Sequence, residues 1–144
     1  MIRVNDRGLL ADFLVCKVGV ALAAFAFIGV VLSMQTSFGH LSEREEMTQL
    51  AEVITDTISA VEFMPGETEL RRQLPLASTE SKVVVTGRRN GDFQVVCVHV
   101  IGDAEVERVL MLTSQVNEGE FRLSVDDPRQ IHLKKSETIQ LELI

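Results

Sequence analysis

The stretch that decides the fold of this chain is VGVALAAFAFIGVVLSM, residues 18–34, which contains no charged side chain. A helix that is apolar on every face is buried in a large core or in a membrane, because its surface offers nothing polar to water. A bilayer core of about 30 Å takes roughly 20 apolar residues in a helix. Residues 13–16 extend the run, and Lys17 can reach back to the lipid headgroups with its ammonium group. The sequence therefore predicts one membrane span over residues 13–36, within a helix covering 9–40.

Composition limits the classes of function that remain. The chain has 144 residues, so that roughly 100 remain outside the anchor, enough for one small domain with its own core. The net charge of −7 argues against nucleic acid and against an anionic membrane surface as partners. Cys16 lies in the predicted span and Cys97 in a later apolar run, so we expect no disulfide between them. Cys97 is interpreted as a small buried hydrophobic residue.

The charges on either side of the span predict its orientation. Three basic residues precede the apolar run: Arg3, Arg7 and Lys17. Three glutamates follow it closely: Glu43, Glu45 and Glu46. Because cytoplasmic flanks carry an excess of Lys and Arg, the N-terminus is predicted in the cytoplasm and the C-terminal domain outside the cell. A cleavable secretory signal, which would release a soluble β-domain, is the alternative; SMQTSFGH after the run offers no A-x-A cleavage site.

A second, amphipathic helix is predicted directly after the span. Ser42 and Glu45 form an S-x-x-E capping box, and Gly39 marks the expected joint between the two helices. Apolar residues then recur at helical spacing: Met47, Leu50, Ile54, Ile58 and Val61. Pro65-Gly66 ends this helix, which therefore lies within residues 41–66.

Residues 67–144 have the pattern of an antiparallel β domain of about six short strands. The expected strands are 82–89, 92–101, 104–114, 120–125, 129–135 and 138–144, with an ambiguous edge strand at 69–76. Asn90-Gly91 predicts a type I′ hairpin turn, and Asn117-Glu118-Gly119 predicts another tight turn. Residues 92–101 are apolar on both faces and are predicted to be central in the sheet. The predicted fold class is α+β, with a meander of strands packed on the amphipathic helix.

No group of residues has the spacing of an active site or of a metal site. His40, His99 and His132 lack metal-ligand spacing, and His99 is interpreted as a satisfied core histidine. Asp126-Asp127 and the basic tip Gly87–Gly91 are interpreted as solvated turns. Phosphate loops, nucleophile elbows, zinc motifs and calcium loops are absent from the sequence. We therefore expect a protein that is not an enzyme and needs no cofactor or metal.

The start of the span carries two features that point to contacts between helices. A carboxylate at the position of Asp12 is costly unless it is solvated at the interface or paired. Lys17 is five residues further on, which is poor geometry for a pair within one helix, so interfacial solvation and a pair with a neighbouring subunit both remain open. Gly19 and Ala23 form a small-xxx-small pair that allows membrane helices to approach closely.

Asp6-Arg7-Gly8, followed at once by LLADF (9–13) and the apolar helix, resembles the type IV pilin-like proteins, above all the archaeal pilin and archaellin group. The resemblance implies that a prepilin peptidase removes a leader, residues 1–8, between Gly8 and Leu9. It also implies that the helix packs into a filament core, that Asp12 meets a neighbour's new N-terminus and that a β-rich headgroup faces outward. Asp12 is an aspartate at the fourth mature position, where bacterial pilins have a glutamate at the fifth, which favours a minor or uncharacterised member.

The sequence thus predicts a membrane-anchored, pilin-like surface protein that forms homo- or hetero-oligomers through its N-terminal helix. Its expected partners are the lipid bilayer, a prepilin peptidase and other subunits, and nucleic acid is not among them. One alternative is a single-pass accessory or binding module of the cell envelope that does not polymerise. The other is the secreted β-domain.

Overall fold

The computed structural model describes residues 6–144, with side chains described for 15–35, 38, 39 and 41–144. Its contacts divide the chain into two units, Met1–Gly39 and His40–Ile144. Helix α1 (Asp6–Phe63) runs from the first unit into the second, and all of the strands belong to the second. The class is α+β, as predicted.

The first part of α1 contains the predicted span. Val15–Gln35, a segment of 21 residues with a mean hydropathy of 2.4, is long and apolar enough to cross a membrane. At a rise of 1.5 Å per residue its length is about 31 Å, which matches the hydrocarbon core of a bilayer. The helix predicted over residues 13–36 is therefore confirmed.

The capping box at Ser42 does not begin a helix. The backbone is helical through Gly39 and on both sides of Ser42, so α1 is assigned as one helix rather than two. The physical reason is that a cap serves N–H groups that lack a carbonyl one turn earlier. Here the preceding turn is itself helical and supplies those carbonyls. The prediction of a helix that starts at Ser42 was wrong, whereas its end at Phe63, before Pro65-Gly66, is confirmed.

Seven strands form two antiparallel sheets among the described residues, not one sheet of about six. The strands are β1 (Thr68–Gln73), β2 (Lys82–Asn90), β3 (Phe93–Ile101), β4 (Glu105–Leu112), β5 (Phe121–Asp126), β6 (Gln130–Lys135) and β7 (Ile139–Leu143). One sheet has the order β4-β3-β2-β5 and the other the order β1-β6-β7. The central position of β3 is confirmed, but the meander is wrong because β5 pairs with β2 and β1 with β6.

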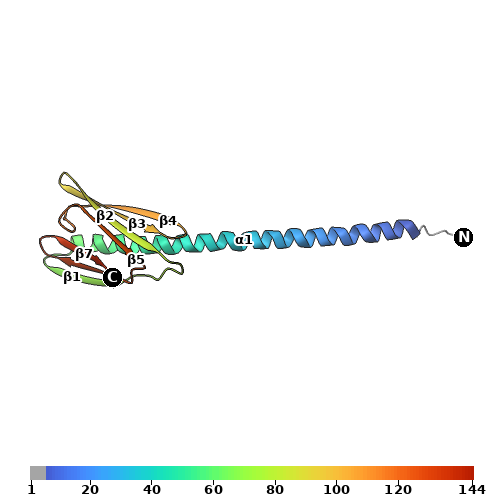
Figure 1. Ribbon diagram of the computed structural model, residues 1–144, viewed down its shortest axis with the longest axis horizontal. Coiled ribbons are helices and arrows are strands. Elements are labelled where there is room, and N and C mark those ends of the chain that lie inside the picture. Colours follow the sequence, from blue (N-terminus) through green and yellow to red (C-terminus); the bar gives the residue numbers. More distant parts are fainter. Residues whose placement is uncertain (1–5) are drawn as a thin grey trace. The chain divides into compact units, whose positions relative to one another are not determined.

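The second half of α1 explains why two sheets are needed. Its buried side chains are Met47, Leu50, Ala51, Ile54, Thr55, Thr57, Ile58 and Val61. At 100° per residue they spread over about 160° of the helix surface, wider than one face of a small sheet covers. Figure 1 shows strands on both sides of this part of α1, with β3 and β4 on one side and β1 on the other. Both sheets contribute apolar side chains to one core around the helix.

The strands present alternate residues to this core. On β2 and β3 the apolar residues of the core cluster are Val83, Val85, Val96, Val98 and Val100. On β6 and β7 they are Ile131, Leu133, Ile139, Leu141 and Leu143. Because side chains alternate across a strand, the residues between them face away from α1.

Polar contacts fix the end of α1 against the strands. The Lys135 ammonium group on β6 donates to the backbone carbonyls of Glu62 and Met64, at 2.7 Å each. These carbonyls have no partner further along the helix, and a cation at a helix C-terminus also opposes the negative end of the helix dipole. The Glu62 carboxylate accepts from the Thr113 hydroxyl at 2.7 Å. The helix end is therefore stabilised by residues from both sheets' strands and loops.

The turns correct one prediction and confirm another. Asn90 pairs with Phe93, so the hairpin loop is Gly91-Asp92 rather than Asn90-Gly91. Only Gly91 has a positive φ there, 63°, which fits a turn with glycine at its first central position. The predicted turn at residues 117–119 is confirmed: the N–H of Gly119 donates to Val116, and Asn117 and Glu118 both have positive φ.

Shortening Ile58 to alanine should lower the free energy of unfolding by about 2–5 kcal/mol, because the side chain is fully buried and leaves a cavity. Ile144→Ala is the matched control, since that side chain is 62% exposed, and it should change stability by less than about 0.5 kcal/mol. The measurement is denaturant unfolding of the full chain in detergent micelles. Equal effects of the two variants would show that α1 is not the centre of the core.

Candidate functional site

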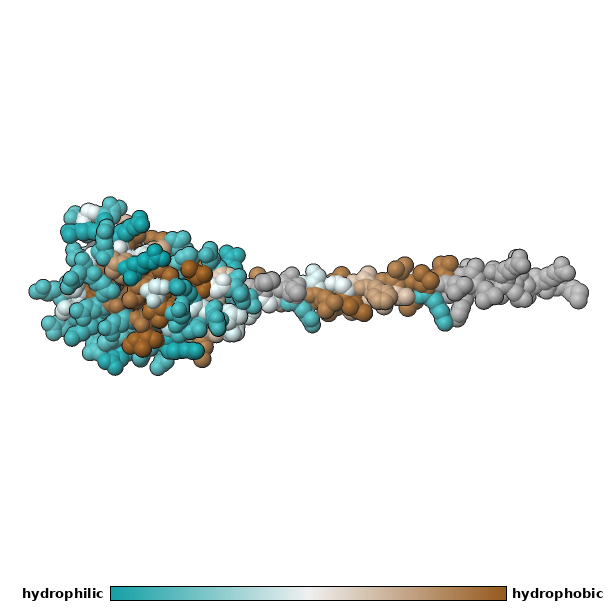
Figure 2. Space-filling view, viewed as in Figure 1, coloured by the Kyte–Doolittle hydropathy of each residue, from teal (hydrophilic) through white to brown (hydrophobic). Residues whose placement is uncertain are grey.

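The most extensive candidate surface is the apolar segment of α1. All side chains of residues 15–35 are exposed, including Val15 at 71%, Phe25 at 73% and Phe27 at 71%. Figure 2 shows these residues as an apolar stretch of the helix. Contiguous apolar surface beyond a few hundred Å² marks a membrane or protein contact in folded proteins. Since the segment also has the length of a bilayer core, lipid is the environment that it fits best.

The small residues of the predicted helix contact lie together on this segment. Gly19 and Ala23 are four residues apart in α1, so they share one face, and both are exposed. A Cβ atom added at Gly19 would meet no other atom within 4 Å. Lys17, two residues before Gly19, is exposed as well. The helix therefore offers a flat face at Gly19 and Ala23 that another helix can approach.

The predicted processing site and its acidic neighbour belong to the start of α1. The structure assigns Gly8, Leu9 and Asp12 to helical backbone. Their side chains lie outside the described residues, and residues 1–5 of the predicted leader 1–8 lie outside them altogether. The contacts predicted for Asp12 and the cut between Gly8 and Leu9 stay predictions.

His99 and Cys97 lie on the outer face of the four-stranded sheet, not in the core. On β3 the even-numbered residues are buried, so both of these side chains face away from α1. The interpretation of His99 as a core histidine was wrong: its side chain is 35% exposed and its Nε2 lies 3.7 Å from a carboxylate oxygen of Glu105. The apolar character of β3 on both faces misled the sequence argument, because its outer face is only half covered by neighbouring side chains.

The Cys97 thiol is a poor nucleophile in this position. Partial burial, together with the nearby Glu107 carboxylate, raises the pKa of the Cys97 thiol to about 11. Its Sγ lies 2.9 Å from Glu107 Oε1. Because the thiolate is the reactive form, the thiol is unreactive at neutral pH. Cys16 and Cys97 are both free, as expected.

The outer face of the three-stranded sheet brings together a histidine and two carboxylates that the sequence argument missed. His132 on β6 lies between Glu69 on β1 and Glu142 on β7. The hydrogen bond from His132 and the neighbouring Arg71 hold the pKa of the Glu69 carboxyl below its ordinary range. Only the pairing of three strands distant in sequence creates this cluster, so no local motif signals it.

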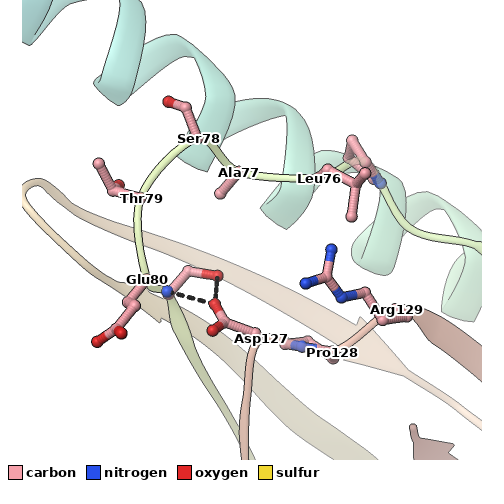
Figure 3. A pocket seen from close by; sticks show the side chains of 10 residues that line it. Leu76, Ala77, Ser78, Thr79, Glu80, Asp127, Pro128 and Arg129 are labelled. Atoms are coloured by element: carbon pink, nitrogen blue, oxygen red, sulfur yellow. Dashed lines mark hydrogen bonds between the residues drawn. The ribbon is translucent and has the colours of Figure 1, made fainter.

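A shallow pocket of about 210 Å³ lies between the loop 75–81 and the turn at 127–129. The Asp127 carboxylate closes one side by accepting from the backbone N–H of Ser81 at 2.6 Å. Figure 3 shows the Arg129 guanidinium directed toward the loop, and Ser78 directed toward the helix. Asp127 has a φ of 46°, which fits the predicted turn at Asp126-Asp127. The mixed charges lining the pocket suit a polar ligand rather than an apolar one.

The loop beside this pocket is held to α1 by one carboxylate. Glu46 accepts from the backbone N–H of Ser78 at 2.8 Å and from its hydroxyl at 2.7 Å. These two hydrogen bonds, the backbone one first, lower the pKa of the Glu46 carboxyl. In the part of the chain with described residues, no three His, Cys, Asp or Glu side chains are arranged to hold a metal ion.

No protein-family model matches this chain, and no curated protein or solved structure matches it.

The Ser78 amide should lose its protection against hydrogen exchange as the pH falls below the ordinary carboxyl range. Because the pKa of Glu46 is lower in the folded protein, its contribution is present above the ordinary carboxyl range and disappears as the pH drops through the lowered value. Glu46→Gln should weaken the protection at neutral pH and remove its acid dependence. Glu45→Gln, an exposed neighbour on α1, is the control and should behave like the wild type. Acid-independent protection in the wild type would contradict the role of Glu46.

Proposed function

We propose that this chain is a membrane-anchored, pilin-like surface protein whose N-terminal helix inserts into the bilayer and whose β domain is exposed to water. The observation that carries the proposal is the helix segment Val15–Gln35, fully exposed and apolar, in the same chain as a domain with a separate core. The anchor and the domain are thus suited to different solvents.

Anchoring follows from the physical chemistry of the helix. A bilayer core requires every backbone polar group to be paired within the spanning segment, and a continuous helix meets this condition. The side chains of residues 15–35 gain their hydrophobic transfer energy only in lipid or against other helices, because none of the described residues covers them. Lys17, near one end of the segment, is positioned to reach the headgroup region.

The β domain has the surface of a protein in water. Its apolar residues from Met47 onward converge on one core, and the outward positions of β1 and β5 carry charged side chains such as Glu69, Arg122 and Asp126. Basic residues before the span and glutamates after it favour a cytoplasmic N-terminus. The proposed location of the domain is therefore outside the cell.

In a pilin-like protein of this kind, the proposed mechanism is assembly of subunits through the N-terminal helix. Gly19 and Ala23 provide the close-approach face, and Asp12 at the start of the span is the candidate for an ionic contact with a neighbouring subunit. A prepilin peptidase that cuts between Gly8 and Leu9 would free the new N-terminal amine that such a contact needs. The proposed partners are the bilayer, the peptidase and other helical subunits.

N-terminal sequencing of the protein purified from its native membrane tests the proposal directly. The expected mature chain begins LLADFLVCK at Leu9. A chain that begins at Met1 is an uncut anchor and contradicts the pilin-like processing. A chain that begins beyond Met34 has lost the span and contradicts membrane anchoring as well.

Asp12→Ala should leave membrane insertion intact and abolish assembly into filaments or oligomers, because it removes the proposed ionic contact without reducing hydropathy. Carbonate extraction of membranes measures insertion, and cross-linking in the membrane measures assembly. Asp56→Ala, which removes an exposed carboxylate from the second half of α1, is the control. Assembly that survives Asp12→Ala unchanged would exclude the intermolecular pair.

An accessory or binding module that does not polymerise is the second candidate, and the outer face of β4 favours it. Val109 is 59% exposed and Met111 is 66% exposed on this edge strand, next to the half-buried Val95 of β3. The other three edge strands place charged or polar side chains at their outward positions. Retention of Met1 in the mature protein would favour this function over the pilin-like one.

A further inference from the structure

The cluster around His132 joins all three strands of the smaller sheet. His132 lies on the middle strand β6, and its Nε2 is 2.8 Å from Glu69 Oε1 on the edge strand β1. Its Nδ1 is 3.4 Å from Glu142 Oε2 on the opposite edge strand β7. The imidazole side chain is only 19% exposed, because it lies between its neighbours on the outer face. Each ring nitrogen therefore faces a carboxylate from a different strand.

This arrangement can be fully satisfied in only one protonation state. A neutral imidazole has one N–H, so its other nitrogen would present a lone pair to a carboxylate oxygen. The imidazolium form donates from both nitrogens at once and adds charge attraction to each contact. Histidine changes between these forms near pH 6.5 in unstructured peptides, within the physiological range.

The other cations on the same face of the sheet lie beside Glu69. Arg71, opposite His132 on β1, donates to the same Glu69 carboxylate from Nη2 at 2.9 Å and from Nε at 3.2 Å. Lys134 follows two residues later on β6, opposite Glu69. Glu69 is thus already paired with a cation, whereas among the described residues the charged partner of Glu142 is His132. Loss of the proton from His132 would leave the contact to β7 without its donor.

We propose that His132 acts as a proton-dependent clamp across β1, β6 and β7, strongest when its ring is doubly protonated. When the ring is doubly protonated, the clamp makes both contacts as a donor, and loss of one proton removes one of its two donors. At the acid end, the lowered pKa of Glu69 means that its contact is lost as the pH falls below the carboxyl range. The sheet should therefore be more stable in mildly acidic than in mildly alkaline solution, because the doubly protonated ring satisfies both carboxylates.

The test is denaturant unfolding of the full-length chain in detergent micelles at about pH 5.5 and about pH 8. In the wild type the unfolding equilibrium constant should rise by about two- to fivefold between these values, an effect of the size that partly exposed pairs produce. His132→Gln keeps one donor and no titrating group, so its unfolding should be nearly independent of pH over this interval. His99→Gln, which removes the exposed pair with Glu105, is the control and should retain most of the wild-type dependence.

A second measurement reports the clamp without a change at His132. Nitrogen NMR of the ¹⁵N-labelled imidazole at about pH 5.5 should show both ring nitrogens protonated. Glu142→Gln removes one charged acceptor, leaves the ring in place and should reduce the pH dependence of unfolding. Wild-type pH dependence in His132→Gln, or a neutral ring with a single N–H at pH 5.5, would overturn the proposal. Either result would leave the proposed membrane function untouched, because the clamp does not depend on the N-terminal helix.

Discussion

Burial of the apolar surface of α1 from Met47 to Val61 is the interaction on which the β domain depends. These side chains cover a broad sector of the helix, and each sheet alone would leave part of that sector in water. Two sheets solve the problem by approaching from different sides, with valines from β2 and β3 and leucines and isoleucines from β6 and β7. In this arrangement β5 pairs with β2 and β1 pairs with β6, so that strands lie on both sides of α1.

The polar groups inside this arrangement are satisfied by residues far apart in sequence. Gln94 is nearly fully buried, yet its amide accepts from the N–H of Val116 and donates to the carbonyls of Val116 and Gly119. A buried amide without partners would cost a few kcal/mol, so this contact fixes the loop between β4 and β5 against β3. Lys135 serves the carbonyls at the end of α1 in the same way. The Gln94 contacts thus join β3 to the loop after β4, and the Lys135 contacts join β6 to the end of α1.

Toward its N-terminus the same helix has a surface that suits a different solvent. Residues 15–35 carry mostly apolar side chains, and among the described residues none buries them. Lipid is the medium in which such a helix needs no partner, and small residues such as Gly19 and Ala23 then allow other helices to pack against it. The contrast between a covered and an uncovered half of one helix is the physical basis of the proposed function.

The sequence by itself determined the features that depend on local patterns. The apolar run at 18–34 predicted the span, the spacing from Met47 to Val61 predicted the buried face of the helix, and the strands were predicted within a few residues. Local patterns are sufficient there, because hydropathy and periodicity act over one or two turns of helix or one strand.

Only the tertiary structure decided which strands meet and which face each side chain takes. The split into two sheets, the outward position of His99 and the Glu69–His132–Glu142 cluster all follow from pairings between distant segments. The prediction of a helix start at the Ser42 capping box was wrong for a related reason. A cap marks the start of a helix only where the preceding turn is not helical, and here that turn is helical. Strand pairing depends on the packing free energy of the whole core, which a short stretch of sequence does not determine.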